Sequence, residues 1–259
     1  MEIVRVRLVD SIKGKDCALA PPLILAGLRK IKSSERGKEI NFDKLRLEEI
    51  HVDLENVEEG NFLIFENAKE IFQKNEKAFF IGGDHSISYS LVRAFAKVHR
   101  EPLLIVFDAG GDIGGKEGNR NWLLRLLEDG FSGSRIVLVS ARNLDELEKD
   151  FLKKHRVTLL SIDVLQENRE EVCDLLMERA VQSKGFYVSV DIGCVDPAFA
   201  PGVTQGKPGG LSSRELIYFI KRLSLLANFC GGDIVEVNPS RDSNEMTVNL
   251  ASVLLSEMI

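Results

Sequence analysis

Four short stretches of the sequence each place an acidic residue or a histidine among glycines and other small residues. The stretches are 82–86 (GGDHS), 108–112 (DAGGD), 189–197 (SVDIGCVDP) and 232–239 (GDIVEVNP). Within them, His85, Asp108, Asp112 and Asp191 offer an imidazole and three carboxylates, and Glu236 offers a further acid. Without a cation these carboxylates would repel one another or take up protons. Because oxygen-rich ligand sets bind divalent ions, the residue types predict a divalent-metal site.

The candidate ligands follow apolar runs that are typical of strands. The runs are 78–81, 103–107, 136–139, 157–162, 186–190 and 234–237. Their unbroken apolar character indicates strands covered on both faces, as in a parallel sheet. Asp108 and Asp191 directly follow two of the runs, and His85 lies just beyond a third. Ligands of parallel sheets bind beyond the carboxyl ends of the strands, so we expect these side chains to converge at one edge.

Two glycines separate the two carboxylates of the second stretch. Since glycine permits sharp backbone turns, Gly110 and Gly111 would bring Asp112 back beside Asp108. Taken alone, such an acidic pair is more often a turn or a cap, and a single histidine after glycines more often satisfies backbone groups. The prediction of a metal site therefore depends on the conjunction of four stretches, each placed where a strand ends.

Helical patterns separate the predicted strands. In 87–98, apolar residues recur at spacings of three and four, which marks one buried stripe of a helix. Ser212 and Glu215 have the spacing of a capping box before a further apolar helix. A chain of 259 residues can bury its core as one domain. We predict a single α/β domain over 1–259, a three-layer α/β/α sandwich with a mainly parallel sheet.

Composition and charge disfavour several classes of protein. With 44% hydrophobic and 29% charged residues, the sequence has no apolar run near the roughly 18 residues of a membrane helix. A net charge of -6 without a basic block disfavours nucleic-acid binding. Residues 1–7 alternate like a strand and lack the apolar core of a signal peptide, which predicts a cytoplasmic protein. The four separated cysteines read as free thiols, and the highly charged region 30–59 as loops and short elements.

In their order along the chain, the four stretches resemble the motif series of the ureohydrolases, the arginase and agmatinase family of manganese enzymes. The resemblance covers most of the chain and implies an arginase-like fold. It also implies a reaction in which a water-derived hydroxide, held between two manganese ions, attacks a guanidinium carbon and releases urea and an amine. A homo-oligomer, a trimer or a hexamer, and a small guanidino-type ligand follow from the same resemblance.

The resemblance also implies a ligand for each metal position. Asp108 and Asp191 match the two carboxylates that bridge both ions, and His85 and Asp112 match the ligands private to the first ion. The private ligands of the second ion would be a histidine at position 110 and an aspartate at position 193, and both positions are glycine here. Three carboxylates and a neutral imidazole around one divalent ion leave a formal charge of about -1. We therefore expect one ion per chain, with Mn²⁺ first and Mg²⁺, Fe²⁺ and Ni²⁺ as alternatives.

Other positions match or depart from the substrate side of the family site. Residues 117–121 (EGNRN) resemble the substrate loop of arginases and include Asn119. In arginases, the position that matches Asn121 is a histidine that is thought to shuttle protons. The side-chain amide of Asn121 cannot exchange a proton near neutral pH. Glu236 resembles the carboxylate that receives the substrate guanidinium. Glu236 and Asp112 are the two candidate catalytic residues. If the side chain of Lys207, near the entrance, faces inward, it would repel a polyamine-like substrate or pair with a substrate carboxylate, and the sequence leaves its direction open.

Three functions remain open at this point. The first is a one-metal hydrolase that cleaves a C–N bond in a small guanidino compound. The second is a catalytically inactive ureohydrolase relic that serves assembly, sensing or regulation. The third is a nucleotide-binding protein that uses the glycine-rich loop 110–115 for phosphate. The third ranks last, because Asp112 stands where the dinucleotide fingerprint needs its second glycine.

Overall fold

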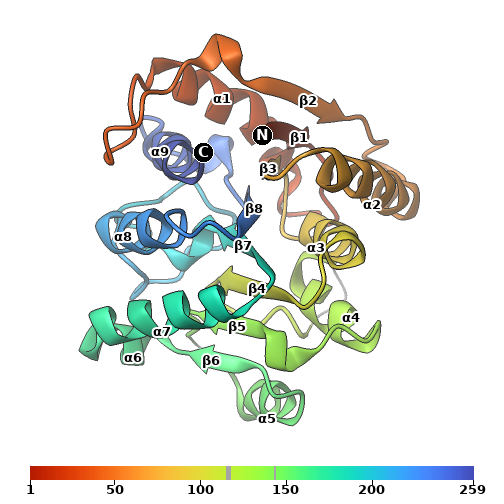
Figure 1. Ribbon diagram of the computed structural model, residues 1–259, viewed down its shortest axis with the longest axis vertical. Coiled ribbons are helices and arrows are strands. Elements are labelled where there is room, and N and C mark those ends of the chain that lie inside the picture. Colours follow the sequence, from red (N-terminus) through yellow and green to blue (C-terminus); the bar gives the residue numbers. More distant parts are fainter. Residues whose placement is uncertain (115–117, 143) are drawn as a thin grey trace.

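The computed structural model describes residues 1–114, 118–142 and 144–259 of the chain. One sheet of eight strands runs through the described residues, in the order β2-β1-β3-β8-β7-β4-β5-β6 (Figure 1). Its strands are β1 (Glu2–Val6), β2 (Arg46–Ile50), β3 (Ala78–Gly82), β4 (Pro102–Phe107), β5 (Ile136–Val139), β6 (Thr158–Leu160), β7 (Gly185–Asp191) and β8 (Phe229–Val235). Every neighbouring pair is parallel. The predicted parallel α/β fold is confirmed.

Helices cover both faces of the sheet. They are α1 (Ala20–Lys30), α2 (Val57–Lys74), α3 (Ile87–Val98), α4 (Trp122–Glu128), α5 (Glu146–Lys154), α6 (Ile162–Glu167), α7 (Arg169–Gln182), α8 (Ser213–Leu223) and α9 (Met246–Met258). One apolar cluster joins one face of the sheet to α1, α6, α7, α8 and α9, and a second joins the other face to α2, α3, α4 and α5. Two cores on opposite faces give the three layers that the sequence predicts (Figure 1).

Local sequence signals account for most of the elements. Strands β3, β4 and β5 are buried along their whole length, as their apolar runs predict. Helix α3 covers the predicted segment 87–98 and buries its apolar stripe. Ser212 caps α8, and Ser212 and Glu215 form both hydrogen bonds of the capping box. The charged region 30–59 contains the edge strand β2, whose first three residues are exposed.

Two predicted strands have different limits in the structure. The apolar run 157–162 predicts one strand, but β6 spans only Thr158–Leu160, and α6 begins at Ile162. The apolar run 234–237 predicts a strand that begins at Ile234, but β8 begins at Phe229. Two glycines and a buried aspartate interrupt the apolar signal of β8. At Gly231 a Cβ atom would lie against the carbonyl oxygen of Ala78 in β3, so only glycine fits this close approach.

Short 3₁₀ helices shape several connections. They are η1 (Lys15–Leu19), η2 (Phe42–Lys44), η3 (Gly118–Arg120), η4 (Gly133–Arg135), η5 (Ile192–Cys194) and η6 (Pro239–Arg241). Two of them, η3 and η5, lie at the edge of the sheet where the predicted ligands gather. Among the helices of the described residues, none is both long and apolar enough to cross a bilayer.

Candidate metal centre

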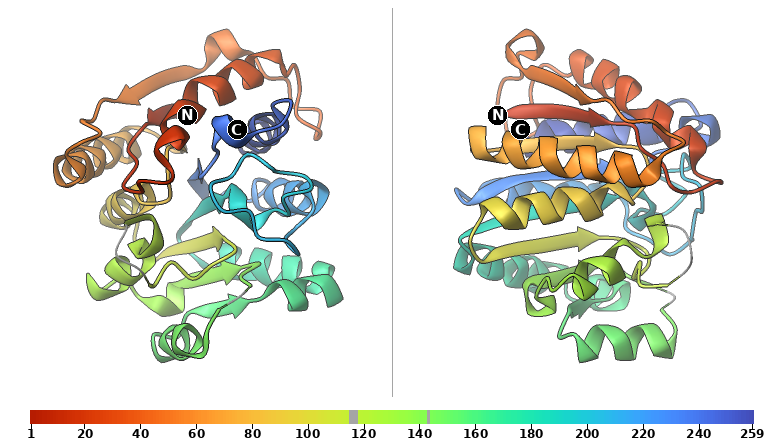
Figure 2. Two further views of the ribbon diagram at one scale, coloured as in Figure 1. Left: turned by 180° about the vertical axis from the view of Figure 1, so that it is seen from behind. Right: turned by 90° about the vertical axis from the view of Figure 1, so that its right-hand side faces the viewer.

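Four neighbouring strands bring the predicted site residues to one edge of the sheet. Strands β3, β8, β7 and β4 are adjacent in this order. His85 lies three residues beyond β3, Glu236 directly follows β8, Asp191 ends β7, and Asp108 directly follows β4. The strands run side by side in the right-hand view of Figure 2, so their carboxyl ends meet at one edge. The predicted convergence is therefore present, although these residues are far apart in the sequence.

The imidazole of His85 faces three carboxylates. Its Nδ1 lies 2.9 Å from Oδ2 of Asp112, 3.2 Å from Oδ2 of Asp108 and 3.9 Å from Oδ2 of Asp191. Ligand atoms of His85, Asp108 and Asp112 all lie within 4.8 Å of one another, and Asp191 stands at the rim of this group. We call this arrangement, His85 and Asp112 with the Oδ2 atoms of Asp108 and Asp191, the His85 half of the site.

The surroundings of Nδ1 of His85 show whether these residues fit a metal ion. The side chain is only 1% exposed, and within the described part of the chain Nδ1 has no hydrogen-bond partner of acceptable geometry. A buried nitrogen without a partner is costly. A divalent cation between Nδ1 and the nearby oxygens would satisfy the nitrogen and offset the repulsion among the carboxylates. The donor set therefore fits a divalent ion.

A hydrogen-bond chain behind the ring fixes which nitrogen faces the carboxylates. The hydroxyl of Ser189 donates to Oδ1 of Asp233 at 2.7 Å, so it accepts from Nε2 of His85 at 3.1 Å. Hydroxyls of Ser88 and Tyr187 donate to the other oxygen of Asp233, at 3.1 and 2.9 Å. With its proton on Nε2, the neutral imidazole presents a lone pair at Nδ1, as a metal ligand requires.

Asp112 is also held by its surroundings. The indole of Trp122 donates to its Oδ2 at 2.8 Å. The residue adopts a left-handed backbone conformation with φ of 46°, which aspartate tolerates better than most residues. The sequence predicts that Gly110 and Gly111 make the sharp turn, but Asp112 itself carries the positive φ, and the two glycines are absent from the positive-φ residues of the described chain. The expected approach of Asp112 to Asp108 is confirmed by another route.

The opposite side of the site is made of backbone instead of side chains. The amide of Gly110 donates to Oδ1 of Asp108 at 2.7 Å, and the amide of Gly193 donates to Oδ1 of Asp191 at 2.6 Å. We call Gly110, Gly193 and these two Oδ1 atoms the glycine half. Each bridging aspartate therefore directs one oxygen to His85 and gives the other to a glycine amide. The loops are in place, but the glycines offer no side chain to a second ion.

Glu236 lies beside the His85 half. Its Oε1 accepts the amide of His85 at 3.0 Å and the side-chain amide of Asn119 at 3.2 Å. The residue has a left-handed backbone with φ of 65°, a strained conformation for glutamate. Strain of this kind persists where the surrounding structure holds it, often at functional sites. The link to Asn119 joins the predicted substrate loop to the predicted guanidinium-binding carboxylate.

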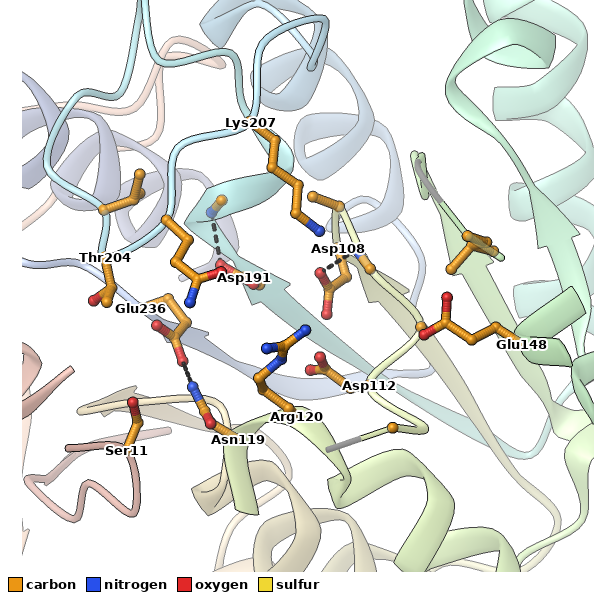
Figure 3. Close-up of a pocket in the computed structure, with 18 residues that line it drawn as sticks. Ser11, Asp108, Asp112, Asn119, Arg120, Glu148, Asp191, Thr204, Lys207 and Glu236 are labelled. Atoms are coloured by element: carbon orange, nitrogen blue, oxygen red, sulfur yellow. Dashed lines mark hydrogen bonds between the residues drawn. The ribbon is translucent and has the colours of Figure 1, made fainter. Parts of the chain in front are cut away.

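The carboxylates of the site and Asn119 line one cavity of about 160 Å³ (Figure 3), whereas His85 is buried and is not among its lining residues. Its wall includes all the predicted aspartates, Glu236 and Asn119, and also the cationic side chains of Arg120 and Lys207. Figure 3 shows both cationic side chains pointing into the cavity, which resolves the direction of Lys207 that the sequence leaves open. No sequence signal predicts the direction of Arg120.

One predicted position, Asn121, lies outside the cavity. Asn121 precedes α4 and lines a separate surface hollow together with Asp10, Asn61 and Arg125. It is not among the residues that line the metal cavity in the described part of the chain. Glu117 of the predicted substrate loop lies outside the described residues, as does the last glycine of the loop 110–115.

Burial and mutual repulsion shift the acid–base properties of the site. Burial and the charge of Asp108 raise the pKa of Asp112 to about 7. Burial, Asp108 and Glu236 raise the pKa of Asp191 well above its usual value. Burial would lower the pKa of His85, but the adjacent carboxylates of Asp108 and Asp112 outweigh burial and raise this pKa. The pKa of Glu236 is also raised, mainly by burial. Without a cation, the cluster therefore retains protons near neutral pH.

Fold and site together define an α/β protein with a carboxylate-rich metal-binding centre at the carboxyl edge of a parallel sheet. The model of the Arginase family matches residues 9–259, and the chain belongs to this family. The predicted resemblance to the ureohydrolases is thereby confirmed.

Similar proteins span several members of this family. The chain is 31% identical to arginase 1, mitochondrial, of Oryza sativa subsp. indica, over 93% of this chain and 75% of that protein. The structure of formimidoylglutamase from Bacillus subtilis superposes with a TM-score of 0.92 at 26% identity, covering 99% of this chain and 85% of that one. For proclavaminate amidino hydrolase from Streptomyces clavuligerus, the TM-score is 0.89 at 25% identity, with coverages of 99% and 89%.

Proposed function

We propose that this protein is a metal-dependent hydrolase that cleaves a C–N bond in a small guanidino-type compound, using one divalent ion per chain. His85, Asp108, Asp112 and Asp191 would hold the ion. The observation that carries the proposal is the buried Nδ1 of His85, which has no hydrogen-bond partner in the described chain and faces three carboxylate oxygens. Membership of the Arginase family supports the reaction class.

The proposal of a single ion rests on the difference between the two halves of the site. The His85 half offers an imidazole and three carboxylate oxygens, whereas the outer oxygens of Asp108 and Asp191 accept backbone amides in the glycine half. Oxygen-dominated ligation favours Mn²⁺ over zinc, and Mg²⁺, Fe²⁺ and Ni²⁺ are the alternatives. A bound divalent ion supplies the acidity that turns water into a nucleophile near neutral pH.

The side chains of this chain would orient the substrate. Glu236 presents a carboxylate inside the cavity, and Asn119 and the amide of His85 fix its Oε1. A fixed carboxylate can bind a guanidinium through charge-assisted hydrogen bonds. Asp112 serves as a ligand and remains, with Glu236, our candidate catalytic acid. The role of Asn121 in a substrate loop stays a prediction, and from its position it would act from outside the cavity.

The absence of ligands at Gly110 and Gly193 favours one alternative, a catalytically inactive member that binds an ion for assembly, sensing or regulation. Losing a second ion removes one of the two groups that clamp the nucleophile and the developing charge. Removing one such stabilising contact costs about 10²–10³ in rate. We therefore expect turnover well below that of a two-metal enzyme, and the alternative predicts none.

Direct assays separate these two functions. Protein saturated with Mn²⁺ is offered arginine, agmatine, guanidinobutyrate and formimidoylglutamate, and urea or glutamate release is measured. Turnover of any of them above the rate of an Asp191→Asn variant supports the hydrolase. A chain that binds one ion per molecule and releases neither product is the inactive relic. A nucleotide-binding function instead predicts NAD or ATP binding that survives chelator treatment.

Three further properties belong to the same proposal. The chain would form one domain over residues 1–259, act in the cytoplasm, and assemble as a homo-oligomer, a trimer or a hexamer. Oligomers of this chain would be detected by sedimentation velocity.

A further inference from the structure

Two cationic side chains enter the cavity that contains the four carboxylates. Arg120 and Lys207 both line it, and Figure 3 shows them approaching from opposite sides. In the described part of the chain, the ion pairs that the cluster's aspartates make within 4.0 Å are with His85. Arg120 and Lys207 therefore point toward the carboxylates across the cavity without forming direct ion pairs with the aspartates in the described part of the chain.

The backbone fixes the position of Lys207. Its carbonyl oxygen accepts a hydrogen bond of 2.7 Å from the guanidinium of Arg142. The same buried guanidinium donates to the carbonyl oxygens of Gly193 and Cys194 at 3.1 Å each. Arg142 thus ties the segment that carries Lys207 to the end of β7, next to the glycine that lacks a metal ligand. The backbone of Lys207 is therefore held at this edge of the sheet by its hydrogen bond from Arg142.

The backbone of Arg120 is held in a similar way. Its carbonyl oxygen accepts the amide of Gly114 at 3.1 Å. In the same 3₁₀ helix, the amide of Gly118 donates to Asp10 at 2.7 Å, and Asn119 donates to Glu236 at 3.2 Å. The guanidinium thus projects from a segment anchored on both sides of the cavity wall.

Charge counting shows what two fixed cations would do here. Four ionised carboxylates, those of Asp108, Asp112, Asp191 and Glu236, and one divalent ion leave a formal charge of about -2. A second divalent ion would cancel this charge in a two-metal site. Two cationic side chains cancel it equally well, and they leave the cavity neutral with one ion bound.

We propose that Arg120 and Lys207 take the place of the second metal ion, balancing the charge of the cavity and weakening its affinity for a further divalent ion. This inference rests on the proposed one-metal function. The two side chains would also place fixed positive charge where negative charge develops during hydrolysis, the role that a second ion plays in two-metal enzymes. Arginine suits this role because it stays charged at all relevant pH values.

Metal titration tests the proposal without relying on turnover. Arg120→Met, Lys207→Met and the double variant are stripped with chelator and titrated with MnCl₂ by calorimetry, and bound manganese is counted by elemental analysis. Removing one positive charge near a divalent ion should tighten Mn²⁺ binding on the order of tenfold. The double variant should tighten it further and take up additional manganese beyond one ion per chain.

Matched controls separate charge from folding. Arg120→Lys and Lys207→Arg keep the charge and should keep the wild-type affinity. Arg100→Met and Lys154→Met remove exposed cations outside the cavity and should change nothing. Thermal unfolding of the metal-free proteins confirms that each variant is folded.

The proposal is overturned if the cavity variants bind Mn²⁺ with the affinity and stoichiometry of the Lys154→Met control. It is also overturned if the wild-type chain already binds two ions. If the wild-type chain binds no ion, the one-metal function fails, and the charge proposal is then decided separately by whether the double variant gains an ion. If manganese binds as expected but no substrate turns over, only the hydrolase function fails.

Discussion

The two halves of the metal centre use the same loops in opposite ways. In the His85 half, side chains from the ends of β3, β4 and β7 converge on one buried nitrogen. In the glycine half, a few residues along the same loops, Gly110 and Gly193 meet the aspartates with backbone amides only. The comparison teaches that neighbouring parts of the same loops can present side-chain ligands on one side and only backbone amides on the other. In the glycine half, the Oδ1 atoms of Asp108 and Asp191 accept hydrogen bonds from backbone amides.

The largest expected effect comes from removing a carboxylate of the His85 half. Asp191→Asn should weaken Mn²⁺ binding by about 100-fold or more, because the change removes one of three anionic ligands and a change to a supporting residue alone costs about 10–100-fold. Calorimetric titration of the chelator-stripped protein measures it. Glu148→Gln is the matched control, because Glu148 lines the same cavity on the side of α5, away from the cluster. Equal affinities of the two variants would show that Asp191 is not a ligand.

Rebuilding the glycine half should turn one ion into two. The variant combines Gly110→His, Gly193→Asp and Asn121→His. A Cβ at position 110 would have no neighbour closer than 3.7 Å, whereas one at position 193 would lie 3.0 Å from Oδ1 of Asp191. We therefore expect Gly193→Asp to lower thermal stability more than Gly110→His does.

Elemental analysis after Mn²⁺ loading provides the measurement, with about two ions per chain expected from the triple variant. The two single glycine variants serve as controls. A triple variant that folds and still holds one ion would show that the difference between the halves extends beyond the two missing side chains.

The pH dependence of metal binding should reflect the protons that the His85 half retains. Burial raises the pKa of Asp112 to about 7 and that of Asp191 above its usual value. Because the ion must displace these protons, Mn²⁺ affinity should rise about tenfold per pH unit for each proton released below pH 7. Titrations at pH 6, 7 and 8 measure this slope, and a flat profile would contradict the predicted protonation.

The metal-free protein should respond to pH in the opposite direction. The raised pKa values of Asp112, Asp191 and His85 mean that the folded chain holds more protons than the unfolded chain near neutral pH. Stability from these groups is lost as pH rises through their folded pKa values. The melting temperature without metal should therefore fall between pH 6 and 8, and Mn²⁺ should restore it most at pH 8.

The smallest of these effects concerns the support behind the His85 half. Ser189→Ala removes the hydroxyl that links His85 to Asp233. Such a change behind a ligand weakens metal binding by about 10-fold. Ser90→Ala is the control, because this serine is also buried but donates its hydrogen bond to Asn61 of α2 instead of to the site. The two variants should be distinguishable by Mn²⁺ titration, and identical affinities would remove Ser189 from the site.

Most of the buried strands can be predicted from the sequence, because burial on both faces leaves unbroken apolar runs. The signal is lost where function or close packing interrupts such a run. In β8, Gly231 allows contact with β3 and Asp233 supports the histidine, so the first half of the strand does not look like one. The charged edge strand β2 was hidden for a different reason, because exposure removes the need for apolar residues.

The candidate metal ligands can be predicted from the sequence, whereas the residues that surround and support them cannot. The positions of His85 and the aspartates follow from motifs at strand ends. Arg120 and Arg142 carry no comparable signal, because their directions depend on how separate loops pack. The chain from His85 through Ser189 to Asp233 joins residues more than 40 positions apart, which one sequence cannot reveal.

The position of β8 has a consequence for biogenesis. This strand lies between β3 and β7 in the sheet, yet it follows both in the chain, and its register pairs Ala78 with Gly231. Until β8 inserts, no strand pairing joins β3, which precedes His85, to β7, which ends at Asp191. Under the proposed function, capture of the divalent ion would then come late, after the central sheet has closed.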